Sequence, residues 1–126
     1  MSSAAPTVNA LAAADRVLVP VQAEYYALEG VAQILGSIEA VRARLNPKLT
    51  IAGLLLTMVD GRTNLAADVG SELERHFGPL LFRTRVPRSV RIAEAPSHGL
   101  PVIAYDRTSP GADAYWKAAM ELVERA

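Results

Sequence analysis

Three continuous apolar runs, separated by stretches with helical periodicity, set the pattern of this sequence. Apolar runs without polar alternation are typical of strands that are buried on both faces of a sheet. Pro20 removes one backbone donor, so we expect the first strand to end near it. In the third run Arg83 and Arg85 alternate with apolar residues, which predicts a strand near an edge or under a polar partner. The three runs cover residues 17–21, 50–59 and 80–86.

The stretches between these runs predict helices. Apolar residues recur every three or four positions over residues 24–45, and Asn46-Pro47 ends that segment. Asn64 is a suitable N-cap for the next helix, which ends at Gly78-Pro79 with glycine as a left-handed cap.

The two ends of the chain are also expected to be partly helical. Residues 1–7 are expected to be a loose leader, and the alanine-rich residues 8–14 a short helix. Ser109-Pro110 combines a cap with proline at the first helical position, so a final helix is predicted from Pro110 to Arg125. It is expected to pack through the apolar residues Tyr115, Trp116, Ala119, Leu122 and Val123.

Strands that alternate with helices predict an α/β fold. Such repeats form right-handed crossovers and a parallel sheet with flanking helices. No linker, repeat or low-complexity tract divides the chain, so residues 8–126 are predicted to form a single domain.

The composition of the chain excludes several classes of protein. The 13 basic and 13 acidic residues balance, and the absence of cysteine excludes disulfides and thiolate metal sites. The longest apolar stretch, residues 51–59, is far shorter than the roughly 20 residues of a membrane span. The amino-terminal residues lack a secretory signal pattern. We therefore expect a cytoplasmic protein without a membrane anchor.

The basic charge is concentrated in one segment. Five arginines and no acidic residue lie between Glu74 and Glu94, namely Arg75, Arg83, Arg85, Arg88 and Arg91. This pattern indicates either an anion-binding face or an ordinary solvated strand end and loop. Arg62 follows the second strand, and Arg88 and Arg91 follow the third. The carboxyl ends of parallel strands meet at one edge, so these three arginines can converge there and contact phosphates, or simply form an arginine-rich rim.

No residue pattern predicts catalysis or a metal site. The chain contains neither G-x-x-x-x-G-K-[ST] nor G-x-G-x-x-G, the glycine loops that bring backbone N–H groups to phosphates. His76 and His98 lack carboxylates at metal-ligand spacing. We therefore assign no catalytic residue and no metal ligand.

A series of segments along the chain matches one known family in the family's own order. These segments are residues 8–11, 14–30, 55–63, 76–78, 86–97, 99–102 and 105–106, followed by 111–112 and Tyr115. Through them the chain resembles the ParA/Soj family of chromosome- and plasmid-partitioning ATPases. The resemblance covers roughly residues 8–126 and matches only the carboxy-terminal half of the family's P-loop fold, which begins with a deviant Walker A loop.

The resemblance implies a function and a set of site residues. Family members are dimers that bind ATP with Mg²⁺ and bind DNA non-specifically, and a ParB-type partner stimulates their hydrolysis of ATP. It implies that Thr57 and Pro87 line the adenine pocket and that Arg62, Arg88 and Arg91 contact DNA. It also implies a cytoplasmic location on the nucleoid. The segment with the phosphate-binding loop has no counterpart here, so this chain alone is not expected to hydrolyse ATP or to bind it tightly.

Two alternatives stay open at this point. The chain can be a non-enzymatic DNA-binding or regulatory module that pairs with a full-length homologue, or an inactive truncated product. A parallel sheet without its first strands exposes an apolar edge, so we expect marginal stability, self-association or dependence on a partner.

Overall fold

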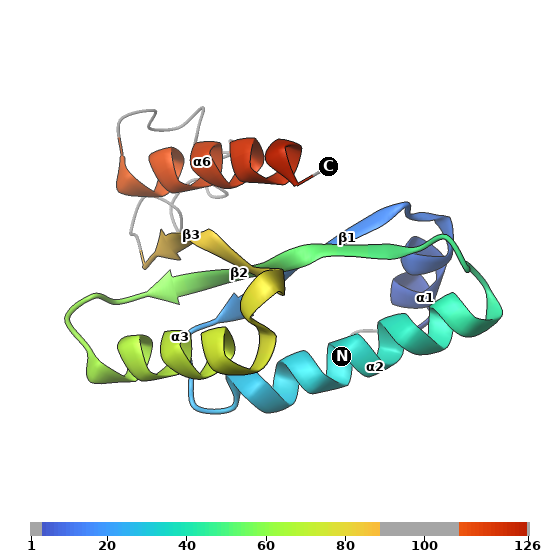
Figure 1. Ribbon diagram of the computed structural model, residues 1–126, viewed down its shortest axis with the longest axis horizontal. Helices are drawn as coiled ribbons and strands as arrows, with labels where there is room; N and C mark the ends of the chain where they lie inside the picture. The colour runs from blue at the N-terminus through green and yellow to red at the C-terminus, as the bar shows by residue number, and fades with distance from the viewer. Residues whose placement is uncertain (1–3, 89–108, 126) are drawn as a thin grey trace.

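In the part of the chain that the structure describes, a three-stranded parallel sheet carries helices on both faces (Figure 1). The computed structural model describes residues 4–88 and 109–125. The strands are β1 (Arg16–Gln22), β2 (Thr50–Val59) and β3 (Leu81–Pro87), in the order β1-β2-β3. The helices are α1 (Ala4–Ala13), α2 (Ala27–Arg44), α3 (Asn64–Phe77) and α6 (Pro110–Glu124), with a 3₁₀ turn η1 (Gly78–Leu80) before β3. The predicted α/β fold with a parallel sheet is confirmed.

The two faces of the sheet have separate cores. Helices α2 and α3 cover one face, where Ile38, Leu54 and Leu73 are fully buried (Figure 1). Helix α6 covers the other face, where Phe82 and Val86 pack against small residues of the helix. β3 pairs only with β2 among the described strands, as its alternating arginines predicted.

Three local predictions were wrong. Helix α1 begins at Ala4, inside the stretch expected to be a loose leader. Pro20 lies within β1 opposite Leu55 and does not end the strand, because its nitrogen faces the side of β1 that lacks a described neighbour. Gly78 has right-handed helical angles (φ −33°, ψ −61°), so the chain continues into η1 without a left-handed cap.

Helix α6 packs through a face that only partly matches the predicted one, since Tyr115 and Leu122 contact the core as expected. Its N-cap is Ser109, as expected, and the side-chain oxygen accepts from the Ala112 N–H. Trp116 and Val123, however, are 60% and 75% exposed. The helix lies close to the sheet through small residues and one acid: Gly111, Ala112, Ala114, Ala118 and Glu121.

Two of the irregularities in the pairing of β2 coincide with a positive φ. The pairing with β1 shifts next to Gly53, whose φ of +157° is a conformation that glycine adopts readily. The pairing with β3 shifts between Leu56 and Val59, and Met58 there has a φ of +56°. The second irregularity lies at the carboxyl end of the strand, where the candidate site residues gather.

Candidate functional site

The carboxyl ends of β2 and β3 bring most of the predicted site residues to one edge of the sheet. Thr57 and Pro87 are the last or nearly the last residues of their strands, and Arg62 and Arg88 follow directly. The N–H of Arg88 donates to the carbonyl of Val59 (2.9 Å), which ties the exit of β3 to the end of β2. Arg91 lies outside the described residues.

Thr57 is buried, and its hydroxyl and its carbonyl form hydrogen bonds with β1 and the residue that follows it. Its hydroxyl donates to the carbonyl of Val21 (3.4 Å), and its own carbonyl accepts from the N–H of Ala23 (3.0 Å). The side chain is 9% exposed. Pro87 is half-buried and pairs with Val59. These contacts place both residues at the same edge, on neighbouring strands.

Arg62 forms a bidentate ion pair with Asp60. Its Nε and Nη2 donate to the two carboxylate oxygens at 3.0 and 3.1 Å, although the arginine side chain is 90% exposed. The backbone N–H of Arg62 also donates to Asp60. These bonds from Arg62, together with the charge of Arg88, lower the pKa of Asp60 to about 2. Asp60 is therefore an anion in the middle of the arginine rim at neutral pH.

Asp60 is a site residue that the sequence interpretation missed. The pair Asp60-Gly61 is a turn signal, and turn chemistry alone accounts for it. The spacing Asp60-x-Arg62 was the available signal, since an arginine two residues after a carboxylate in a tight turn can reach back to it. Because Asp60 offsets the charge of Arg62, the rim is less basic than its arginines suggest.

Met58 is the second feature that the sequence did not predict. Left-handed backbone angles cost a non-glycine residue about 1–2 kcal/mol, and bulges next to strand ends often re-aim a side chain. Here Met58 is 42% exposed at the same edge as Thr57 and Asp60. The bulge thus turns an apolar side chain of a buried strand out to solvent.

The described arginines of the basic segment differ in their contacts. Arg75 pairs with Glu72 at 2.7 Å and Arg83 with Glu124 at 3.0 Å. The Arg85 guanidinium lies against the backbone of α3, where a Cβ on Gly70 would be 2.7 Å from Nη1. Within the described part of the chain, Arg88 alone of the five is both exposed and at the carboxyl edge.

The described residues contain neither a metal-ligand cluster nor a glycine loop for the phosphates of a nucleotide. No group of three His, Asp or Glu side chains lies close enough together to hold a metal within residues 4–88 and 109–125. The glycine loops that hold phosphates are absent from the sequence. Over the same residues, no helix has the length and apolar content needed to cross a bilayer.

Comparison with known proteins gives one consistent group of relatives. Residues 2–51 match the model of a family described as AAA domain. The chain is 57% identical over 119 residues to the chromosome-partitioning ATPase Soj of Thermus thermophilus, covering 94% of this chain and 48% of that protein. It is 50% identical over 116 residues to the sporulation initiation inhibitor protein Soj of Bacillus subtilis, covering 92% and 46%. The chromosome partitioning protein ParA of Caulobacter vibrioides is 48% identical over 119 residues, covering 94% and 45%.

A solved structure shares the fold. Cobyrinic acid a,c-diamide synthase from Mycobacterium smegmatis is 33% identical, with a TM-score of 0.71 over 93% of this chain and 41% of that protein. The same enzyme with a bound ATP analogue and magnesium gives a TM-score of 0.73. The chain spans about half the length of the curated relatives it matches. Its sequence identity to several partitioning proteins, over nearly all of its own length, shows that the chain belongs to the ParA/Soj family.

Proposed function

We propose that this chain supplies the DNA-facing edge and one wall of the nucleotide-base pocket of a ParA/Soj-type chromosome- or plasmid-partitioning ATPase. The observation that carries the proposal is the convergence of Arg62 and Arg88 at the carboxyl edge of the sheet, where the Arg88–Val59 hydrogen bond joins the two strands. In open α/β sheets ligands bind at this edge. Arginines held there suit phosphate contacts, which give affinity without reading sequence.

In this proposal the complete protein, and not the isolated chain, binds ATP and Mg²⁺. Support comes from the solved relative with bound ADP and magnesium. Thr57 and Pro87 are proposed as walls for the adenine, because both lie at the edge where the strands end. The described residues do not fit the phosphates or the metal ion, so the isolated chain is expected to show no ATP hydrolysis.

The proposed partners follow from the family. The complete protein would bind DNA non-specifically on the nucleoid in the cytoplasm and would respond to a ParB-type partner. It would act as a homodimer, or the chain would pair with a full-length homologue. A non-enzymatic DNA-binding module is the second candidate, favoured by the arginine edge in a sequence without a phosphate loop. If the chain is instead an inactive truncated product, we expect no DNA binding.

Arg88→Ala is expected to weaken binding of the chain to labelled duplex DNA by roughly threefold to tenfold. One lost phosphate contact also lowers the slope of log affinity against log salt by about 1. The measurement is fluorescence anisotropy at several salt concentrations. Arg44→Ala is the matched control, because Arg44 is an exposed cation at the end of α2 that precedes β2, at the opposite edge of the sheet. Equal losses for the two variants would contradict a localised DNA edge.

Asp60→Asn is expected to strengthen DNA binding by a few-fold. The substitution removes the anion that holds Arg62 and leaves the guanidinium free for phosphate. Since the pKa of Asp60 is about 2, wild-type Asp60 stays charged throughout the usual assay range, and the gain should not depend on pH between about 5 and 8. Glu39→Gln is the control, because Glu39 pairs with Arg42 on the distant helix α2. Unchanged or weaker binding of the Asp60 variant would show that Arg62 does not face DNA.

A further inference from the structure

Helix α6 carries an apolar stripe on the side that faces away from the sheet. Trp116, Met120 and Val123 are 60%, 54% and 75% exposed, and they follow one another at spacings of four and three residues. With about 3.6 residues per turn, this spacing places all three on one face of the helix. Ala114 and Ala118, which pack on the sheet, lie on the opposite face. The stripe therefore points out of the fold, and a neighbour must approach it from outside the layer of helices.

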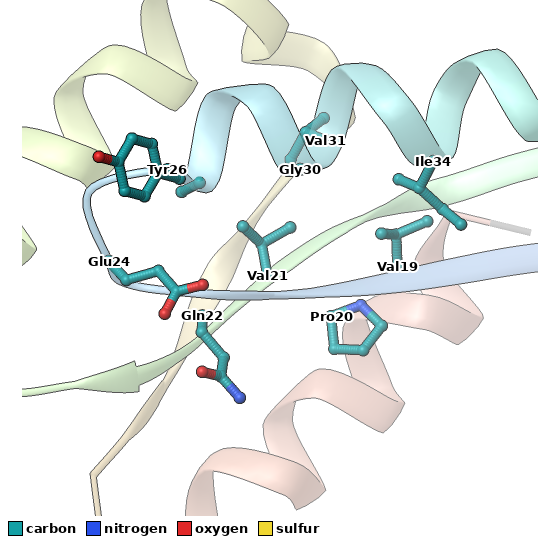
Figure 2. A pocket seen from close by; sticks show the side chains of 10 residues that line it. Val19, Pro20, Val21, Gln22, Glu24, Tyr26, Gly30, Val31 and Ile34 are labelled. Carbon is teal, nitrogen blue, oxygen red and sulfur yellow. The ribbon is translucent and has the colours of Figure 1, made fainter. Parts of the chain in front are cut away.

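A second exposed apolar surface lies on the other side of the sheet. Figure 2 shows Val19 and Val21 of β1 pointing toward Val31 and Ile34 of α2, around a cavity of about 380 Å³. Helices α2 and α6 cover opposite faces of the sheet (Figure 1). A substitution in this cavity is therefore expected to leave the stripe on α6 unchanged, and the two surfaces can be tested separately.

The residues of the stripe have the spacing of a coiled-coil seam. Met120 stands at an a position and Trp116 and Val123 at d positions, where the apolar side chains of paired helices meet. Lys117 and Glu124 are then both e positions. They lie beside the seam on the same side, and their side chains are 65% and 63% exposed. Contiguous apolar side chains with charged neighbours are typical of a surface that binds a protein partner.

A second copy of the same helix complements this stripe in one orientation. If two α6 helices pack antiparallel about a two-fold axis at Met120, Trp116 of each copy lies near Val123 of the other. The axis is perpendicular to the plane of the two helices and keeps each flank on its own side. It therefore sets Lys117 of one copy opposite Glu124 of the other, and opposite charges at such positions select the partner and its orientation.

The parallel orientation lacks this complementarity. In a parallel helix pair the e positions lie opposite the g positions of the partner helix. The g positions of α6 are Ala112 and Ala119, so Lys117 and Glu124 would have no charged partner. Charge complementarity thus favours the antiparallel pair.

We propose that the outer face of α6 is a homodimer contact, in which two copies of this chain pack their α6 helices antiparallel about a two-fold axis at Met120. The contact lies apart from the arginine edge and requires neither nucleotide nor DNA. A single helix pair buries little surface, and such small interfaces are weak, so we expect a dissociation constant of roughly 10–100 μM.

Sedimentation equilibrium of the purified chain, without nucleotide or DNA, tests this proposal. Met120→Lys brings two like charges together at the axis and is expected to weaken dimerisation at least tenfold. Leu45→Lys is the matched control, because Leu45 is an apolar residue, 58% exposed, at the end of α2. Gly30→Trp fills the cavity of Figure 2 and is the control for association through β1. Both controls are expected to dimerise like wild type.

The fluorescence of Trp116 gives a second measurement of the same contact. Trp116 is the only tryptophan of the sequence, and it is largely exposed in the single chain. Its emission maximum is expected to shift to shorter wavelength as the protein concentration rises, because dimerisation removes the indole from water. Met120→Lys should abolish the shift over the same concentrations.

A charge exchange tests the orientation of the two helices. Lys117→Glu and Glu124→Lys each set like charges opposite one another, and each is expected to weaken dimerisation by roughly threefold to tenfold. The double variant restores opposite charges and is expected to dimerise within about twofold of wild type. Far-UV circular dichroism should show an unchanged helix content in all variants, because every substituted residue is exposed.

Four outcomes would overturn the proposal. These are a wild-type chain that stays monomeric well above the expected dissociation constant, a dimer that Met120→Lys leaves intact, a dimer that Gly30→Trp dissociates, or a double exchange that dimerises no better than the single ones. The third result would assign the contact to β1. The assay contains no DNA, so its failure is distinguishable from failure of the proposed function, which the DNA titrations measure separately.

Discussion

Gly53→Ala is expected to destabilise the fold by about 3 kcal/mol or more. The added Cβ would lie 2.5 Å from Cε1 of Phe82 and 2.6 Å from the carbonyl oxygen of Leu80. Phe82 is 1% exposed and the carbonyl is backbone, so neither can move aside cheaply. Overpacking a core costs about 1–3 kcal/mol. The φ of +157° adds a strain of about 1–3 kcal/mol for a residue with a side chain.

Urea denaturation followed by far-UV circular dichroism measures this effect. Gly36→Ala is the control, since open space surrounds Gly36 and the helix should gain about 1 kcal/mol from alanine. The two glycine substitutions are therefore expected to act in opposite directions. If Gly53→Ala were as stable as wild type, the close packing of β2 on Phe82 would be wrong.

Glu121→Ala is expected to cost roughly 3 kcal/mol or more and to detach α6 from the sheet. The carboxylate of this buried residue accepts from the N–H groups of Arg83 (2.8 Å) and Thr84 (2.9 Å) and from the Thr84 hydroxyl (2.8 Å). It also pairs with Arg125 at 3.0 Å. Removing it leaves the donors of Arg83 and Thr84 unsatisfied and takes away the counter-charge of Arg125, which keeps only neutral partners, the carbonyls of Pro79 and Leu81. Removing one partner is the costly way to break such a cluster. Glu124→Ala is the control, because its pair with Arg83 is exposed and worth at most about 1 kcal/mol.

The same carboxylate should make the wild-type chain sensitive to acid. Burial raises the pKa of Glu121, but the hydrogen bonds from Thr84, Arg83 and Arg125 outweigh it and lower the pKa to about 2. The folded-state pKa lies below the ordinary value of 4.5, so the stabilisation is complete above about pH 4.5 and is lost as the pH falls through about 2. The difference corresponds to about 3 kcal/mol. Urea denaturation between pH 6 and 2.5 should show a shallower loss of stability in Glu121→Ala, and parallel curves would contradict this role.

The order of elements could be predicted because the apolar patterns of this chain are strong. β2 runs over Thr50–Val59 as the continuous apolar stretch indicated, and α3 runs over Asn64–Phe77. The N-cap of α3 is Thr63 and not Asn64, a shift of one residue, since the Thr63 hydroxyl accepts from Ala66. The periodicity and the length of an apolar pattern are enough to predict such elements, without knowledge of contacts between distant residues.

The packing of α6 could not be predicted from its own sequence. Apolar spacing correctly predicted that Tyr115 and Leu122 contact the core. It also predicted Trp116 and Val123, which are exposed, and missed the buried Ala114, Ala118 and Glu121. Glu121 is a core residue only because β3 presents two N–H groups and a hydroxyl to it, an arrangement that no local pattern contains. Small residues then let the helix approach Phe82 closely.

The sequence predicted where the candidate site residues lie in the fold, but only part of their contacts and charge. Parallel strands bring their carboxyl ends together, so the placement of Thr57, Arg62 and Arg88 followed from topology. The neutralisation of Arg62 by Asp60 and the left-handed Met58 depend on the conformation of one turn and one bulge. The ion pair with Asp60 determines how much of the charge of Arg62 is available to a ligand.

The proposed function is tested most directly by titrating the purified chain onto labelled duplex DNA of unrelated sequences over a series of salt concentrations. We expect binding of similar affinity to every sequence. Log affinity should fall linearly against log salt with a slope of about −2 or steeper, as expected for two or more phosphate contacts. Absent binding, or affinity that does not change with salt, would contradict the assignment of this edge to DNA.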